Sequence, residues 1–355
     1  MKRIERLRAK LAEQDLDAMF VSQPENRRYM SGFTGSAGYL IISHKEAVLA
    51  TDFRYTEQAG LQAPDYRVIQ VAGDMSKWLP DVLAAGGVRR IAFDADHVSY
   101  NFFQLLTKAT GESGVTWAPT SGVVEYLRAI KEPEEIAAVE RAQALTDAAF
   151  LHVTQHVLHP GMTEAQLAWE LEKYIREHGG DGLAFDTIIA AGPNGARPHH
   201  RAGSTVIEEG QPIVIDMGAK VDGYCADMTR TIVLGQPDDT FKKIYDIVLG
   251  AQLLAEELIR TGQTGHQADA FARDLIDQAG YGETFGHSLG HGIGLYVHEY
   301  PRLSKGATNI LEDNMIFSVE PGIYLTGWGG VRIEDLVVLE NGSARVITRS
   351  PKAAP

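Results

Sequence analysis

Four acidic residues lie inside apolar, strand-forming runs of the second half of the chain, and their placement restricts the fold more than any other feature. Asp216 stands in VIDMG, Asp227 in CADMTRTIV, Glu320 in FSVEPG and Glu334 in VRIED. A single strand acid usually faces solvent. Inside apolar runs an unpaired carboxylate is costly to bury, so we expect the four acids to gather around positive charge.

The first two acids flank a hairpin signal. In PIVIDMGAKVDGYCADMTRTIVLG two β-rich runs surround KVDG, and Asp222 followed by Gly223 favours a tight turn. A hairpin centred between Val221 and Asp222 puts Asp216 directly opposite Asp227, with Cβ atoms about 4.5–5.5 Å apart on one face. Carboxylates that close repel each other unless a cation or a proton lies between them.

The second two acids follow the same arrangement. In SVEPGIYLTGWGGVRIEDLVV the turn is centred near Gly327, and Glu320 and Glu334 are equidistant from it. This spacing predicts another facing pair. Four carboxylates with at least one histidine form an oxygen-rich site that suits manganese, cobalt or zinc. Their combined charge favours two ions, and metal pairs about 3.5–4 Å apart activate a bridging water in many hydrolases.

The segment HSLGHGIGLYVHE at 287–299 supplies three candidate histidines. Two histidines four residues apart are typical of a zinc site on a helix, but the glycines of this segment disfavour a helix. We therefore expect extended or looped backbone. Strand alternation would put His287 and His291 on one side and His298 on the other, unless a bend intervenes. The spacing alone does not select the metal ligand.

The domain organisation follows from alternating strand and helix signals. A chain of 355 residues exceeds the usual size of one hydrophobic core. The first part predicts a small α/β domain, with strands at 17–22, 38–43, 46–53, 66–71 and 90–96 and helices at 75–86 and 101–111. Near residue 131 a long helix begins with Pro133 in its first turn. We therefore expect domains at 1–128 and 129–355.

The C-terminal domain carries further helix signals. Capping-box patterns begin at Thr163 and Thr264, glycines that can end a helix follow at Gly179 and Gly280, and Asp238 precedes another long helix. Strand pairs lie between and after these helices. We expect helices packed on a largely antiparallel sheet, which makes the whole chain a two-domain α+β protein.

Composition excludes several classes of protein. The net charge of −14 argues against a nucleic-acid partner. Cys225 is the single cysteine, which excludes an internal disulfide and a cysteine-based zinc site. No apolar run approaches the roughly 20 residues that span a bilayer. The N-terminal MKRIERLRAKLAEQ continues as an amphipathic helix instead of a signal peptide, so we expect a cytoplasmic protein with no membrane partner.

These motifs resemble a known family. The order Asp216, Asp227, His291, Glu320 and Glu334, set in VIDMGAKVDGYCADMTRT, HSLGHGIG, SVEPGIY and GGVRIED, resembles the pita-bread metallopeptidases, in particular the branch of aminopeptidase P and prolidase. The N-terminal domain resembles the smaller creatinase-like domain of that branch. The resemblance implies two metal ions bound by these five residues, with manganese as the first choice and cobalt or zinc as alternatives.

The resemblance also implies catalytic roles. Glu320 is placed like the acid that takes the proton of the bridging water. His298, in VHE, matches a histidine that binds substrate or assists proton transfer, and His199, in ARPHH, matches one that donates to the substrate or leaving group. No role follows for the adjacent His200, which is expected to be a solvated loop histidine.

Four further residues are implied as supporting or substrate-binding groups. His287, Tyr324 and Arg332 match positions that support the site, steady the transition state or orient ligands. Arg302, in HEYPR, matches a position where some prolidases carry an arginine suited to a carboxylate, which it can hold bidentately.

The expected substrates are peptides with proline in the second position. Proline has no amide N–H and a fixed φ, which spoils the extended binding that most peptidases use. Segments 29–38 and 51–59 resemble aminopeptidase P, so we expect an Xaa-Pro aminopeptidase, with an Xaa-Pro dipeptidase (prolidase) as the alternative. A metal-free relative that acts as a binding protein is a remote alternative. The resemblance further implies a homodimer.

Overall fold

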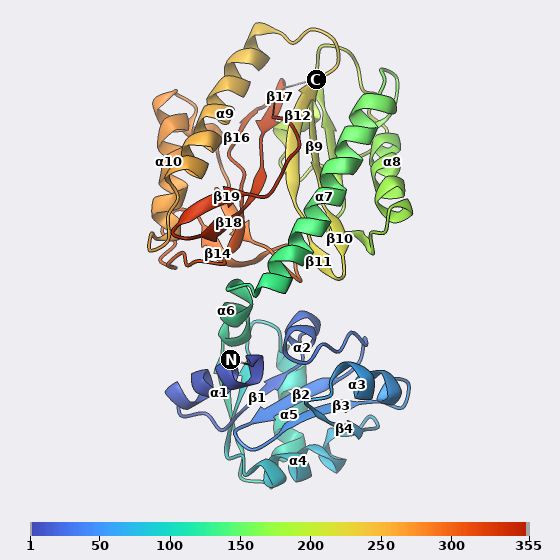
Figure 1. Ribbon diagram of the computed structural model, residues 1–355, viewed down its shortest axis with the longest axis vertical. Helices are drawn as coiled ribbons and strands as arrows, with labels where there is room; N and C mark the ends of the chain where they lie inside the picture. Colours follow the sequence, from blue (N-terminus) through green and yellow to red (C-terminus); the bar gives the residue numbers. More distant parts are fainter. Residues whose placement is uncertain (1, 353–355) are drawn as a thin grey trace. The chain divides into compact units, whose positions relative to one another are not determined.

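The computed structural model describes residues 2–352. Its contacts divide the chain into two compact units, Met1–Arg128 and Ala129–Pro355. Figure 1 shows the helices and strands that build each unit. In the described part of the chain, no helix has both the length and the apolar character needed to cross a membrane.

The N-terminal unit is built on a six-stranded sheet with the order β4-β3-β2-β1-β5-β6. β2 pairs antiparallel with β1 and β3, and the other pairs are parallel. The strands are β1 (Ala18–Val21), β2 (Tyr39–Ser43), β3 (Ala47–Thr51), β4 (Arg67–Gln70), β5 (Arg90–Asp94) and β6 (Thr116–Thr120). The helices are α1 (Arg3–Glu13), α2 (Pro24–Ser31), α3 (Thr56–Gln62), η1 (Met75–Lys77), α4 (Leu79–Gly86), α5 (Tyr100–Thr110) and α6 (Val123–Ala129).

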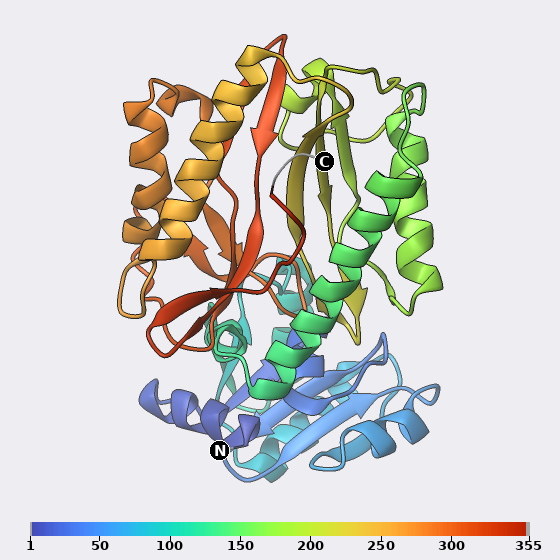
Figure 2. The same ribbon diagram turned by 45° about the horizontal axis from the view of Figure 1, so that its top comes forward.

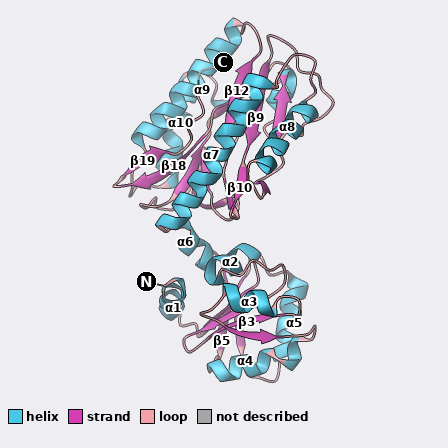
Figure 3. Ribbon diagram, turned by 45° about the vertical axis from the view of Figure 1, so that its right-hand side comes forward, coloured by secondary structure: helices cyan, strands magenta, loops and turns pink. Residues whose placement is uncertain are grey.

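This unit has the predicted α/β character. The five predicted strands are present, and α4 and α5 pack with β1, β3 and β5 in one hydrophobic cluster. In Figure 3, α3 and α4 lie on opposite sides of the sheet. Several short elements were outside the prediction: β6 contains Pro119, and α2 has no periodic apolar stripe, so neither carries the usual signal.

The C-terminal unit is larger, and its described strands form four antiparallel sheets that pack against four long helices. The helices are α7 (Pro133–His156), α8 (Glu164–Glu177), η2 (Gly192–Ala196), α9 (Asp239–Leu258), α10 (Gly265–Gln278) and η3 (Gly282–Thr284). The first strands are β7 (Gly182–Leu183), β8 (Ile188–Ala191), β9 (Pro212–Met217), β10 (Ala219–Val221), β11 (Tyr224–Cys225) and β12 (Met228–Val233). The later strands are β13 (Gly290–Gly292), β14 (Glu299–Leu303), β15 (Ile316–Val319), β16 (Gly322–Leu325), β17 (Gly329–Arg332), β18 (Asp335–Glu340) and β19 (Ser343–Val346).

The helix starts follow the predicted signals. α7 begins at Pro133, and Thr163 and Thr264 cap α8 and α10 in complete capping boxes. α9 begins after Asp238, whose side chain caps it. The named strands of this unit that are described pair antiparallel, as predicted.

The C-terminal unit has two halves, each with a helix pair packed on strands. α7 and α8 pack on β8, β9 and β12, while α9 and α10 pack on β15 and β18. In Figure 1 and Figure 2 the strands lie between the two helix pairs. The hydrophobic clusters therefore lie on the outer side of the strands, under the helices.

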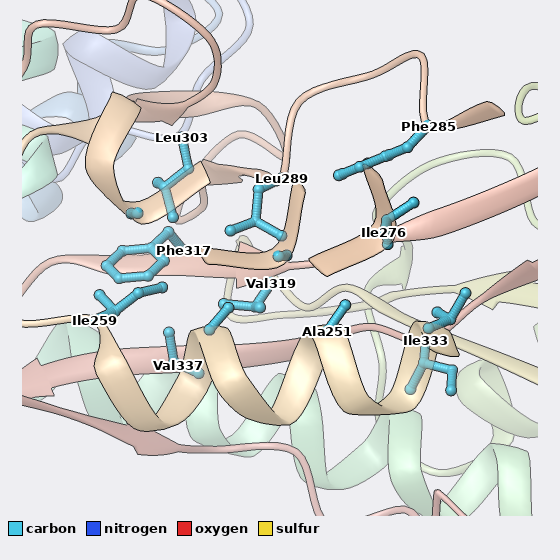
Figure 4. Packing of buried hydrophobic residues seen from close by; sticks show 14 of the residues in the cluster. Ala251, Ile259, Ile276, Phe285, Leu289, Leu303, Phe317, Val319, Ile333 and Val337 are labelled. Atoms are coloured by element: carbon cyan, nitrogen blue, oxygen red, sulfur yellow. The ribbon is translucent and has the colours of Figure 1, made fainter. Parts of the chain in front are cut away.

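Strand alternation decides which side chains face away from the helices. In β9, Ile215 lies in the cluster with α7 and α8, so Asp216 points to the opposite face. In β15, Phe317 and Val319 lie against α9, as Figure 4 shows, so Ser318 points to the opposite face. The polar positions of both halves are thus directed away from their own helices.

Candidate metal centre

The first acid pair lies on a hairpin whose register differs from the prediction. Asp216 faces Thr229, and the turn is formed by Asp222 and Gly223, both at positive φ. A two-residue turn with positive φ at both positions centres the hairpin one residue later than expected. The predicted direct facing of Asp216 and Asp227 is therefore wrong, and the two acids are diagonal neighbours on one face.

The second acid pair has the predicted register. β15 pairs with β18, with Val319 opposite Asp335, and β16 pairs with β17 in the same register around a turn in which Gly327 has positive φ. Glu320 and Glu334 lie between these two ladders at equivalent positions. They consequently face each other where the strand pairing is interrupted.

The extended backbone of β13 brings His291 to the acids. Nε2 of His291 lies 3.3 Å from Oε1 of Glu320 and 3.6 Å from Oδ2 of Asp227. Ligand atoms of Asp227, His291 and Glu334 all lie within 4.8 Å of one another. The strands of both halves thus contribute to one cluster.

The glycine-rich segment bends after β13, which brings His298 to the side of His291. Bends occupy residues 294–298, and the two imidazole rings meet edge to face with centroids 4.4 Å apart. A Cβ atom at Gly292 would collide with the backbone of Tyr300, so glycine permits this close approach of β13 and β14. The bend that the sequence requires for His298 to lie on the same side as His291 is therefore present.

Two hydroxyl groups that were not among the predicted site residues donate hydrogen bonds to the acids. Thr229 Oγ1 donates to Oε2 of Glu334 at 2.7 Å, and Ser318 Oγ donates to Oε1 of Glu320 at 3.1 Å. Each hydroxyl stands two residues from an acid, in DMT after Asp227 and in SVE before Glu320. Positions two apart share a strand face, and this spacing is the signal that identifies them.

Three of the four predicted supporting residues, His287, Tyr324 and Arg332, form one hydrogen-bonded chain. Nη2 of Arg332 donates to Oδ2 of Asp216 at 2.7 Å, and its Nη1 donates to the hydroxyl of Tyr324 at 2.9 Å. Nε2 of His287 lies 2.8 Å from the same hydroxyl, and its Nδ1 lies 2.8 Å from the carbonyl oxygen of Ser288. A carbonyl only accepts, so Nδ1 carries the proton and Tyr324 donates to Nε2.

Arg302 and His199 lie at the margin of this cluster. Arg302 stands opposite His291 across the β13–β14 pair, and both Arg302 and His199 are exposed. Burial lowers the pKa of His298 to about 4, and the neighbouring His291, Arg302 and His199 act in the same direction. Arg302 and His199 therefore lie near His298, on the side of the cluster that carries the histidines.

His200 is not the solvated loop histidine that the sequence suggests. Its Nε2 lies 2.8 Å from Oε2 of Glu164, and the Glu164 side chain is fully buried. The partner is 36 residues earlier, at the start of α8. No local pattern reveals this tertiary contact.

Burial dominates the protonation of the acids. It raises the pKa of Asp227 and of Glu334 well above the usual carboxyl values, and the charges of the neighbouring carboxylates add to the effect. Burial also raises the pKa of Glu320, although the neighbouring His287 and Arg332 oppose the rise. Such acids retain protons unless a cation compensates their charge.

The side chains present fit divalent metal ions. Oδ1 of Asp216 is buried and has no hydrogen-bond partner among the described residues. Burial lowers the pKa of His291, which favours the neutral imidazole that metals require. Carboxylates with one imidazole suit manganese, cobalt or zinc.

Comparison with known proteins identifies the family. Residues 137–341 match the metallopeptidase family M24, and residues 3–130 match the creatinase/prolidase N-terminal domain. An Xaa-Pro dipeptidase of Pyrococcus furiosus is 34% identical over 356 residues, covering 99% of each chain.

Solved structures agree with this comparison. The structure of an Xaa-Pro dipeptidase from Bacillus anthracis is 43% identical, covers 100% of this chain and 99% of its own, and has a TM-score of 0.96. That of an X-Pro aminopeptidase from Thermotoga maritima is 39% identical, covers 99% of each chain, and has a TM-score of 0.89. The predicted two-domain fold and hydrolase class are confirmed. The chain belongs to the Xaa-Pro peptidase branch of metallopeptidase family M24, which combines a creatinase/prolidase N-terminal domain with the catalytic domain.

Proposed function

We propose that the chain hydrolyses the peptide bond between a first residue and a following proline, with two divalent metal ions held by Asp216, Asp227, His291, Glu320 and Glu334. The observation that carries this proposal is the gathering of acidic side chains around His291 where the two halves of the C-terminal unit meet. Four carboxylates bear more charge than one divalent ion offsets, which supports a pair of ions.

The metal ions, when bound, polarise the scissile carbonyl and lower the pKa of a water molecule. The side chains carry out the proton transfers. Glu320 accepts the proton of the attacking water, because burial raises its pKa and stabilises its protonated form. The same carboxyl then returns the proton to the proline nitrogen, which leaves as an amine.

His298 and His199 donate hydrogen bonds to the reacting substrate in this proposal, and His199 acts at the substrate or the leaving group. The pKa of His298 is lowered to about 4 by burial, so its imidazole is neutral near pH 7 and can donate an N–H to a substrate carbonyl. Arg332 supports the site from behind, since it fixes both Asp216 and Tyr324.

For substrate length we propose a preference for the Xaa-Pro dipeptide. Arg302 is opposite His291 in the strand register and exposed, and it has no ion-pair partner in the described part of the chain. Its guanidinium can pair with the free carboxylate of a terminal proline through two parallel hydrogen bonds. This arrangement and the relatives named dipeptidases favour the dipeptidase over the aminopeptidase that the sequence put first.

An Xaa-Pro aminopeptidase is the second candidate, favoured by the segments 29–38 and 51–59 and by the similarity to the X-Pro aminopeptidase from Thermotoga maritima. The test offers an Xaa-Pro dipeptide and an Xaa-Pro-Xaa tripeptide side by side with added manganese. Fast cleavage of the dipeptide alone supports the dipeptidase, and cleavage of the tripeptide supports the aminopeptidase. Cleavage of neither, in a purified protein that contains no metal, contradicts the whole proposal and favours a binding protein.

Three further expectations, two from the resemblance and one from the N-terminal sequence, stay predictions. Manganese is the proposed metal, a homodimer is the proposed assembly, and the cytoplasm is the proposed location. Elemental analysis of the protein purified without added metal tests the first, light scattering in solution tests the second, and cell fractionation tests the third.

A further inference from the structure

We infer that Glu164 is a positioning residue that fixes the segment 191–203, which carries His199, and that it affects turnover through that histidine. The inference rests on the role of His199 in the proposed function. Glu164 is the first residue of α8, and its side chain is fully buried, at 0% exposure. A carboxylate buried this completely needs several hydrogen-bond donors to remain ionised.

Both carboxylate oxygens of Glu164 are used by one segment. Oε1 accepts from the backbone N–H of Ala191 at 2.9 Å and from Nδ2 of Asn194 at 2.8 Å. Oε2 accepts from the backbone N–H of Gly203 at 3.1 Å and lies 2.8 Å from Nε2 of His200. One side chain thus connects the start, the interior and the end of the segment.

These donors keep the carboxylate charged. Burial acts to raise the pKa of Glu164, but the hydrogen bonds from Asn194, Ala191, His200 and Gly203 together lower it below the usual value. Hydrogen bonds to an ionised acceptor are roughly twice as strong as those between neutral groups. Glu164 therefore stabilises the segment more than a neutral side chain of the same shape would.

The helix start adds backbone contacts to the same segment. The N–H of Glu164 donates to the carbonyl oxygen of Thr205, and that of Ala165 donates to the carbonyl oxygen of Gly203, both at 3.0 Å. The free N–H groups of a helix's first turn are here satisfied by the segment that the side chain also holds. The end of the segment is consequently fixed to α8 by both backbone and side chain.

The other side of the segment rests against β17, the strand that carries Arg332. A Cβ atom at Gly195 in η2 would collide with the backbone of Gly330 in β17, and one at Gly330 would collide with that of Gly195. β17 ends at Arg332, the partner of Asp216. The segment is thereby held between α8 and a strand of the site.

His199 depends on this support because it is exposed. Side-chain packing does not orient an exposed imidazole, so its place near His298 follows from the backbone on either side of it. Its neighbour His200 is the residue through which Glu164 reaches that backbone most directly. Misplacement of a catalytic group by about 1 Å can reduce turnover a hundredfold.

The test is a double-mutant cycle with Glu164→Gln and His199→Ala, assayed on an Xaa-Pro dipeptide. We expect Glu164→Gln to lower kcat about tenfold or more with little change in KM or metal content. We expect His199→Ala to lower kcat about a hundredfold, and the double variant to match His199→Ala within about threefold. Effects that multiply in the double variant would overturn the inference.

Two further variants separate positioning from general loss of stability. His200→Gln keeps a donor near the position of Nε2 and should retain most of the activity, whereas His200→Leu removes it and should resemble Glu164→Gln. Asp17→Asn is the matched control, because Oδ2 of Asp17 accepts the N–H groups of Arg89 and Arg90 at 2.8 Å within the N-terminal unit. We expect kcat and KM of that variant to equal those of the wild type.

Hydrogen exchange distinguishes a failure of this inference from a failure of the proposed function. Amides of 192–203 should exchange faster in Glu164→Gln, with the strands β9 and β12 unchanged. A wild type that does not cleave Xaa-Pro peptides would contradict the proposed function while exchange still reports on the segment. Unchanged exchange in 192–203 would overturn the positioning role directly.

Discussion

Nη2 of Arg332 lies 2.7 Å from Oδ2 of Asp216, so among the described residues the protein supplies a positively charged partner to only one oxygen of this carboxylate. Its other oxygen, Oδ1, is buried without a hydrogen-bond partner among residues 2–352. Asp227 has no lysine or arginine ion-pair partner in the described chain. The metal-free site therefore stores electrostatic repulsion that ion binding relieves.

Asp227→Asn should stabilise the metal-free protein. Burial and the charges of Glu334, Asp216 and Glu320 raise the pKa of Asp227, so folding without metal bears the cost of protonating this carboxyl, and a neutral isostere avoids that cost. We expect a gain on the order of 1 kcal/mol in the free energy of unfolding in chelator, since one pKa unit corresponds to about 1.4 kcal/mol. With manganese the order should reverse, because the variant loses a ligand.

Denaturant unfolding with chelator and with manganese measures both effects. Asp222→Asn is the control, because it makes the same chemical change on the same hairpin at an exposed turn position. We expect little change from it in either condition. A loss of stability of Asp227→Asn in chelator would contradict the prediction.

Metal removal should lower both activity and stability of the wild type. A ligand that binds only the folded state at about 100 times its Kd adds roughly 2.7 kcal/mol to the free energy of unfolding. We expect chelation to abolish cleavage and to lower Tm, and manganese to restore both. Activity that survives exhaustive chelation, verified by elemental analysis, would exclude the metal-dependent mechanism.

Tyr324→Phe should lower kcat without releasing metal. The Tyr324 hydroxyl accepts from Arg332 and donates to His287, so its loss leaves the buried Arg332 and the partly buried His287 each short of a partner. One such hydrogen bond is worth about 1–1.5 kcal/mol, or roughly tenfold in rate. Tyr296→Phe, at an exposed tyrosine of the nearby glycine-rich segment, should leave kcat unchanged.

Arg302→Leu should raise KM for an Xaa-Pro dipeptide selectively. Hydrogen bonds to a charged group contribute about 1.5–3 kcal/mol, which predicts a rise of roughly ten- to a hundredfold. Arg302→Lys should recover only part of the affinity, since an ammonium group does not bind a carboxylate bidentately. Equal losses for the dipeptide and for a peptide amide lacking the carboxylate would count against this role.

Glu256→Gln should weaken the pH dependence of stability. Burial raises the pKa of Glu256 to about 8 from the ordinary 4.5, with Asp335 adding to the shift and Lys352 opposing it. Between these values the folded state keeps a proton that the unfolded state releases, so stability falls as pH rises through this range, by up to about 1.4 kcal/mol per unit. Below pH 4.5 and above pH 8 this group adds no slope.

Unfolding free energies at pH 5, 6, 7 and 8, all in chelator, measure the slope. The variant should lose less stability than the wild type over the range. Glu257→Gln, the same substitution at the next and exposed position, should keep the wild-type slope. Parallel curves for Glu256→Gln and the wild type would refute the assignment.

The two hairpin turns show what local sequence can and cannot predict. The pair of Glu320 and Glu334 was placed correctly from the symmetry around Gly327, whose positive φ closes the turn. The predicted centre of the first hairpin was wrong by one residue, because both turn residues, Asp222 and Gly223, have positive φ and the hairpin is centred between them. A dipeptide identifies a turn more reliably than it identifies the register.

Contacts between distant segments could not be predicted from the sequence. In the sequence His200 resembles a solvated loop residue, and its contact with Glu164 arises only in the folded chain, where α8 brings Glu164 to it. Likewise, Thr229 reaches Glu334 across 105 residues, from one half of the C-terminal unit to the other. The fold class, helix starts and acid positions follow from local patterns, whereas these partners depend on tertiary packing.

The interruption between the two ladders at Glu320 and Glu334 also limits how the chain can change length. Both ladders share one register across the loop 326–328. An insertion or deletion of one residue there would rotate one acid to the opposite face, because side chains alternate with a period of two. Relatives that keep the metal centre should therefore differ in this loop only by changes that preserve the pairing of Glu320 with Glu334.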